Sequence, residues 1–181
     1  MLRATVPADA TKVKVGGAGD TPTYHQLVQS GFDREPPAGK EAHGIEVSRE
    51  IRATDGSVPT QTSITSRLEV VLFVRSTDDE TRAVALVDLL PGGFEVDLAS
   101  DALAARRSLV SGKDEWTPDY VDVREDRVVF YGAASPEAHR FVYRIKPTNR
   151  GRYRVPPVFA EAFYDRGAWG RGLGGEIVVG D

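Results

Sequence analysis

The sequence predicts an all-β chain folded as an antiparallel β-sandwich, and three observations support this. Apolar residues recur at every second position over much of the chain, which is the period of a half-buried strand. Gly, Pro and Asp separate the apolar runs at short intervals, as turns do in sandwiches. Only the segment 98–109 has the Ala-, Leu- and Arg-rich composition of a helix, with Ser100 or Asp101 as its N-cap.

The strands are expected in the following order. In the segment 44–52, Ile45, Val47 and Ile51 share one face, with Arg49 between them. The runs 67–76 and 82–91 are apolar on both faces, which predicts central strands covered on both sides. Further strands are expected at 127–132, 140–146, 151–157, 158–164 and 176–180. The total is about nine to eleven short strands and one helix.

Bulk composition excludes several classes of function. The chain has 181 residues, which suits one domain with or without an extra arm. Its net charge is -4, from 23 basic and 27 acidic residues, so a general nucleic-acid binder is not expected. An apolar run of membrane-spanning length is absent, so direct membrane insertion is not expected either. The lack of cysteine excludes disulfides and thiol nucleophiles.

One cluster of carboxylates raises the question of a metal site. The segment 119–127 contains Asp119, Asp122, Glu125 and Asp126. Oxygen ligands this close together could bind calcium, but their spacing differs from that of an EF-hand loop. Arg124 and Arg127 would also neutralise the cluster locally. We therefore expect ion pairs on a solvated strand and turn, and no metal.

Residues for catalysis cannot be assembled from the sequence. The three histidines, His25, His43 and His139, lie in separate contexts, and no Gly-x-Ser-x-Gly nucleophile motif is present. The Gly-rich segment 166–175 lacks the Gly-Lys-Ser/Thr ending of a phosphate loop. We expect the protein not to be an enzyme and to need no cofactor.

Two neighbouring aromatic residues, Phe163 and Tyr164, lie just before the Gly-rich segment. Neighbours on a regular strand point to opposite faces, so one ring would be buried and the other exposed. Both can be exposed only if the strand ends or bulges there. Exposed aromatic residues next to arginine are typical of interface hot spots. Core packing and partner binding both remain open on these residues alone.

Several longer motifs resemble a known family. They are VALVDLLPGGFEV (84–96), DYVDVREDRVVFYG (119–132) and RFVYRIKPTNRGRYRVPPVFAEAFYDR (140–166), together with YHQLVQSGFDREPP (24–37). In this order they resemble the C-terminal domain of bacterial alpha-2-macroglobulins. The resemblance covers most of residues 21–181, which we therefore predict to be one domain. Residues 1–20 are expected to be a leading segment or the end of an interdomain linker.

The resemblance implies a fold and a function. Members of this family are large periplasmic proteins, many of them anchored as inner-membrane lipoproteins, that trap target proteases after bait cleavage. A reactive Cys-Gln thioester captures the protease covalently, although some members lack it. The C-terminal domain is implied to be a macroglobulin-like, immunoglobulin-like β-sandwich. It packs on the thioester domain of the same polypeptide and shields the thioester from water.

The resemblance also implies which residues make this contact. A bulky apolar residue followed by Tyr, just before Asp-Arg, serves there in the family, and Phe163 and Tyr164 match these two positions. Asp165 and Arg166 match the motif as possible contact support.

An alternative function is a stand-alone carbohydrate- or cell-wall-binding module. In that reading Trp116, Trp169 and Tyr164 would form a stacking platform, and the acidic cluster at 119–127 could hold calcium.

Overall fold

The structure is a computed structural model that describes residues 4–7, 9–16, 22, 24–28, 37–98 and 115–181. The chain divides into two compact units, Met1–Arg34 and Glu35–Asp181. The described residues of the first unit form no strand or helix and contain a turn in which the Ala10 N–H donates to Pro7 O at 3.1 Å. The predicted boundary at residue 20 remains a prediction.

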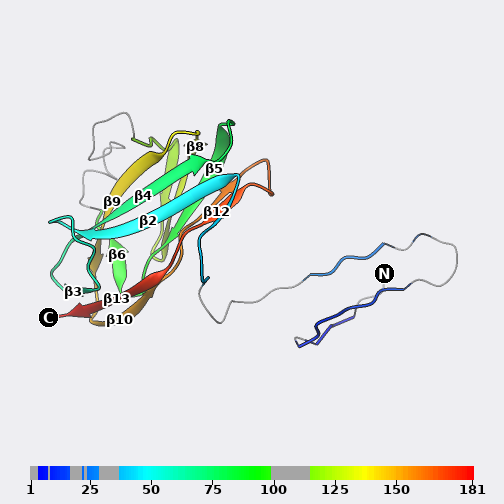
Figure 1. Cartoon of the computed structure of the whole chain (residues 1–181). Coiled ribbons are helices and arrows are strands. Elements are labelled where there is room, and N and C mark those ends of the chain that lie inside the picture. The colour runs from blue at the N-terminus through cyan, green and yellow to red at the C-terminus, as the bar shows by residue number, and fades with distance from the viewer. Residues whose placement is uncertain (1–3, 8, 17–21, 23, 29–36, 99–114) are drawn as a thin grey trace. The chain divides into compact units, whose positions relative to one another are not determined.

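The second unit is built from strands, as Figure 1 shows. The described residues form β1 (Glu41–His43), β2 (Ile45–Ala53), β3 (Gln61–Ser63), β4 (Leu68–Ser76), β5 (Arg82–Leu89), β6 (Phe94–Val96), β7 (Tyr120–Val123), β8 (Arg127–Ala134), β9 (His139–Pro147), β10 (Gly151–Val155), β11 (Phe159–Ala162), β12 (Trp169–Arg171) and β13 (Gly175–Gly180).

The strands form three sheets. A six-stranded sheet has the order β1-β12-β11-β5-β8-β7, and a four-stranded sheet has the order β2-β4-β9-β6. The third sheet has the order β10-β13-β3, in which only β13 and β3 pair in parallel. Buried apolar residues from all three sheets form one core. This is the antiparallel β-sandwich that the alternating pattern predicted.

Two single elements were expected with other bounds or lie outside the described residues. The strand expected at 158–164 ends at Ala162, because Phe163 and Tyr164 lie in a bend. The helix expected at 98–109 lies outside the described residues, apart from Leu98, which is in a turn and exposed. The all-β class does not depend on this segment.

A buried ion pair links the two larger sheets. Arg49 of β2 pairs with Asp88 of β5, and their side chains are 3% and 1% exposed. Tyr143 of β9 donates its hydroxyl hydrogen to the second Asp88 oxygen at 2.6 Å. Burial raises the pKa of Asp88, and the Arg49 cation opposes that shift. Arg49 also donates to the carbonyls of Leu89 and Pro156, which explains why an arginine lies on the apolar face of β2.

The outer faces of the two larger sheets differ in chemistry. The outer face of the four-stranded sheet carries the ion pairs Glu46–Arg75, Glu69–Arg144 and Glu95–Lys146. Such pairs are ordinary solvent-exposed features of small stability. The outer face of the six-stranded sheet carries a row of aromatic rings.

Candidate interaction surface on the six-stranded sheet

Four aromatic rings lie in contact across the outer face of the six-stranded sheet. Tyr120 of β7 stacks on Tyr131 of β8, with ring centroids 5.9 Å apart. Tyr131 stacks on Phe163 at 5.8 Å, and Phe163 contacts Tyr164 at 6.3 Å. We call these four residues the aromatic ladder. Its rings come from two strands, β7 and β8, and from the turn that follows β11.

Both residues singled out from the sequence, Phe163 and Tyr164, project from the sheet. Phe163 is 50% exposed and Tyr164 is 95% exposed. Regular pairing stops at Ala162, whose N–H donates to Ala168 O at 2.9 Å and closes a turn, while the Phe163 N–H still donates to Ala83 O at 3.0 Å. Alternation ends with the strand, so the two neighbouring rings do not have to face opposite ways.

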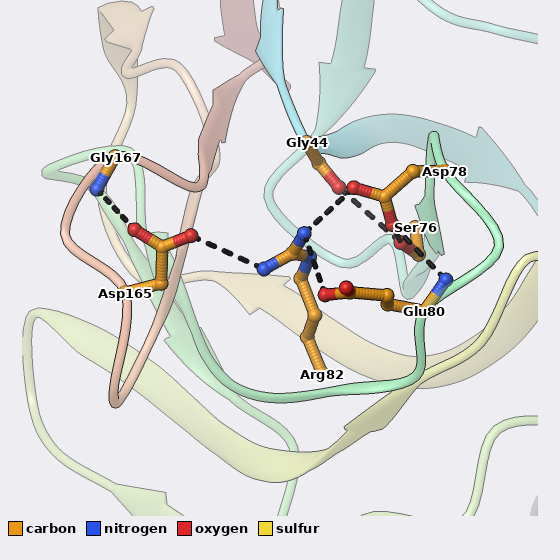
Figure 2. A network of polar contacts seen from close by, with 7 residues as sticks. All are labelled: Gly44, Ser76, Asp78, Glu80, Arg82, Asp165 and Gly167. Atoms are coloured by element: carbon orange, nitrogen blue, oxygen red, sulfur yellow. Dashed lines mark hydrogen bonds and ion pairs between the residues drawn. The ribbon is translucent and has the colours of Figure 1, made fainter.

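An arginine of β5 holds this turn in place, as Figure 2 shows. One Arg82 nitrogen, Nη1, donates to Asp165 at 3.2 Å, and the other, Nη2, donates to Asp78 at 2.6 Å and lies 3.0 Å from Glu80. Asp165 in turn accepts the Gly167 N–H at 2.9 Å. Asp165 therefore links the turn to β5 and also closes the turn on itself.

The charges around Arg82 are coupled. A hydrogen bond from Arg82, followed by one from the Ser76 hydroxyl, lowers the pKa of Asp78 to about 2. The hydrogen bond to Asp78 raises the pKa of Arg82. Three carboxylates surround this single guanidinium, so the turn is anchored by a network with an excess of negative charge.

A second aromatic group lies toward the β1 edge of the same sheet. Trp169 of β12 stacks on His43 of β1 with ring centroids 4.4 Å apart, and it lies 6.2 Å from Phe159 of β11. Beside these rings is an open hollow of about 590 Å³ lined by Phe159, Glu161, Arg166, Trp169 and Arg171. Arg171 forms an ion pair with Glu41 of the edge strand.

The stacking platform of the carbohydrate-binding alternative is wrong in this structure. Trp116 is only 3% exposed and belongs to the core, where its indole N–H donates to Ala133 O at 2.7 Å. It therefore cannot join Trp169 and Tyr164 in stacking on a sugar. The remaining two residues belong to the separate aromatic groups described above.

The acidic segment 119–127 forms the ion pairs that were expected. Asp122 binds Arg124 at 2.8 Å, and Asp126 binds Arg127 at 2.5 Å. Within the described residues, no three or more His, Asp or Glu side chains come together as a metal site. The same residues contain no helix long and apolar enough to cross a membrane.

The histidines remain apart. His25 lies in the first unit, His43 stacks on Trp169, and His139 follows the β8–β9 turn. Ser135 Oγ lies 2.6 Å from His139 Nε2, but it donates its only hydrogen to Glu137 at 2.7 Å. These contacts link Ser135, Glu137 and His139 across the β8–β9 turn.

Sequence reasoning missed three residues of this surface. Tyr120 and Tyr131 lie in segments whose sequence indicates ion pairs and an alternating strand. Tyr131 contacts Phe163 and Tyr120 contacts Tyr131, which depends on the strand order β11-β5-β8-β7. Arg82 lies 83 positions from Asp165, so nothing local in the sequence indicates that pairing.

Comparison with known proteins places the chain in a family. A family model described as the bacterial alpha-2-macroglobulin MG10 domain matches residues 44–166. An alpha-2-macroglobulin homolog of Yersinia pestis is 36% identical over 94% of this chain, and an alpha-2-macroglobulin of Rickettsia conorii is 29% identical over 86% of it. The chain spans only 9% and 8% of the length of these relatives.

Solved structures show the same fold. Native Escherichia coli alpha-2-macroglobulin matches 83% of this chain with a TM-score of 0.70 and 21% identity, and the match covers 10% of the larger protein. Salmonella alpha-2-macroglobulin reacted with methylamine matches 83% of the chain with a TM-score of 0.66 and 21% identity, covering 10% of that protein. The fold is therefore that of a macroglobulin-like domain. The chain belongs to the family of bacterial alpha-2-macroglobulin MG10 domains.

Proposed function

We propose that the chain is the non-catalytic C-terminal domain of a bacterial alpha-2-macroglobulin, a periplasmic inhibitor that traps proteases. In the native state, Phe163 and Tyr164 pack on the thioester domain of the same polypeptide and shield its thioester from water. Target proteases are bound by the longer polypeptide and not by this domain. Family membership and the small share of each relative's length that the chain spans support this proposal.

The exposure of the aromatic turn carries the shielding role. Tyr164 is 95% exposed and Phe163 is 50% exposed. A large aromatic side chain can bury about 150–250 Å² of surface against a partner, and this burial is favourable. A thioester survives in water only where water and amines are excluded. Two adjacent rings on a turn held by Arg82 and Asp165 are well suited to cover such a bond.

The test uses the longer polypeptide. Replacing Phe163 and Tyr164 with Ala is expected to speed thioester hydrolysis and methylamine incorporation before any protease is added. Leu173→Ala is the control, because Leu173 is similarly exposed at 45% and lies outside the aromatic ladder. Unchanged thioester reactivity in the double variant would show that these rings shield nothing.

A further inference from the structure

The outer face of the six-stranded sheet has the composition of a protein interface. Its aromatic ladder and its second aromatic group contain six exposed or half-buried rings of Tyr, Phe and Trp, at positions 120, 131, 159, 163, 164 and 169. The opposite outer face of the sandwich carries several ion pairs and one partly buried ring, Phe73. Aromatic enrichment with charges at the margin distinguishes interface cores from ordinary surface.

One arginine that lines the hollow has no ion-pair partner among the described residues. Arg171 is engaged by Glu41. Arg166 is exposed, and it has no hydrogen bond or ion pair with any residue that the structure describes. Arg166 lines the same hollow as Trp169 and Phe159, so an anion bound there would lose water on the aromatic side. Charge-assisted bonds strengthen in such a setting.

We infer that this hollow receives the carboxylate of an Asp or Glu side chain presented by a neighbouring domain of the same polypeptide. The identity of that partner rests on the proposed function. The relatives extend far beyond this chain, which spans 9% of one of them, so most of the polypeptide lies outside it. The turn that carries Phe163 and Tyr164 also carries Arg166, so a domain resting on those rings lies next to the hollow.

Glu161 lowers the affinity of the hollow for a carboxylate. It lines the hollow and is an exposed carboxylate without a hydrogen bond or ion pair in the described part of the chain. A bound carboxylate is therefore attracted by Arg166 and repelled by Glu161. Such opposition keeps the contact weak enough to be broken, which suits a domain that must release its partner after bait cleavage.

The first test uses the 181-residue chain by itself. Its only two tryptophans give two indole N–H resonances, and buried Trp116 is an internal reference for Trp169. Titration with blocked glutamate is expected to move the Trp169 resonance, whereas uncharged blocked glutamine moves it less. Arg166→Gln should abolish this difference. Arg154→Gln is the matched control, because Arg154 is exposed and also lacks a partner in the described structure.

The outcomes of this titration separate the ligands. Equal displacement by blocked glutamate and blocked glutamine, or an unchanged difference in Arg166→Gln, would overturn the inference. A larger displacement by glucuronate than by blocked glutamate would indicate a sugar acid and would also overturn it. Glu161→Gln is expected to increase the response to blocked glutamate, and a decreased response would contradict the assigned charge balance.

The second test identifies the occupant in the longer polypeptide. Hydrogen–deuterium exchange of residues 159–171 is expected to be slower there than in the isolated chain. Arg166→Glu should restore fast exchange, and Arg154→Glu should not. Equal exchange in the two proteins would show that no neighbouring domain covers the hollow. These outcomes do not involve the thioester, so they are distinguishable from failure of the shielding role.

Discussion

Phe163 stacks on Tyr131 with ring centroids 5.8 Å apart and ring planes inclined by 17°. The pair joins the turn after β11 to the outer face of β8, across the intervening strand β5. Stacked aromatic pairs contribute about 0.5–1.5 kcal/mol beyond the area they bury. This contact therefore holds one side of the aromatic turn even where no partner domain is present.

A double-mutant cycle tests that coupling. Phe163→Ala, Tyr131→Ala and the double variant are compared by urea unfolding of the chain. The coupling free energy is expected to be about 0.5–1.5 kcal/mol. The pair Phe163 and Leu173 is the control, because these residues share no ring contact, and it should show additive effects. Additivity between Phe163 and Tyr131 would mean that the stacking does not fix the turn.

The buried ion pair of Arg49 and Asp88 predicts that removing one partner destabilises the protein more than removing both. Asp88→Ala leaves the Arg49 side chain, which is 3% exposed, without its carboxylate. Breaking a buried pair in this way costs about 3–5 kcal/mol of unfolding free energy. Arg49→Met combined with Asp88→Leu removes both charges and should recover a substantial part of the loss. Urea unfolding measures both, and a double variant as unstable as Asp88→Ala would contradict this account.

The Arg82 network predicts a dependence of stability on pH. The pKa of Asp78 is lowered to about 2 in the folded protein, from an ordinary value of 3.8. The contribution of Asp78 is therefore fully present above pH 3.8 and is lost as pH falls through about 2. The unfolding free energy of Asp78→Asn should change less between pH 4 and about 2 than that of the unsubstituted protein.

Asp79→Asn is the control for the pH measurement. It removes a neighbouring carboxylate that has no hydrogen bond or ion pair in the part of the chain that the structure describes. Its pH profile is expected to match that of the unsubstituted protein. A flattened profile in both variants would point to general charge repulsion and away from the Arg82 hydrogen bond.

Close approach between β12 and β2 predicts a strict requirement for glycine at one position. A Cβ atom at Gly170 would lie 2.4 Å from the carbonyl oxygen of Ile45. Gly170→Ala should therefore push two strands apart and lower the unfolding free energy by about 1–3 kcal/mol. Gly175→Ala, which meets no atom within 4 Å, should leave stability unchanged or slightly raised. Thermal unfolding of both variants provides the comparison.

The sequence allowed the class of fold to be predicted, because burial on one face imposes alternation residue by residue. The strand at Ile45–Ala53 and the strand at Leu68–Ser76 lie within one residue of their expected bounds. The end of β11 at Ala162 was not predictable in this way. It depends on the turn bond from Ala162 to Ala168 and on the anchoring of Asp165 by Arg82, and neither contact is local to the strand.

The candidate site was predictable only in part, because some of its contacts join residues that are far apart in the sequence. Phe163 and Tyr164 were found through a motif, and the structure shows both of them exposed. Tyr120, Tyr131 and Arg82 joined them only once the order β11-β5-β8-β7 was known. A sequence pattern reports which face a residue occupies, whereas sheet order decides which distant residues become its neighbours.

The sheet order also sets a sequence of events during synthesis. Strands β5, β7 and β8 leave the ribosome before β11, so Tyr120, Tyr131 and Arg82 can be in place when Phe163 and Tyr164 emerge. The pairing of β1 with β12 forms later still, because it needs residues 169–171. The aromatic surface of the domain is thus completed only after the strands that support it have been synthesised. Its exposed rings then emerge next to a sheet that can hold them, which limits the time in which they can make wrong contacts.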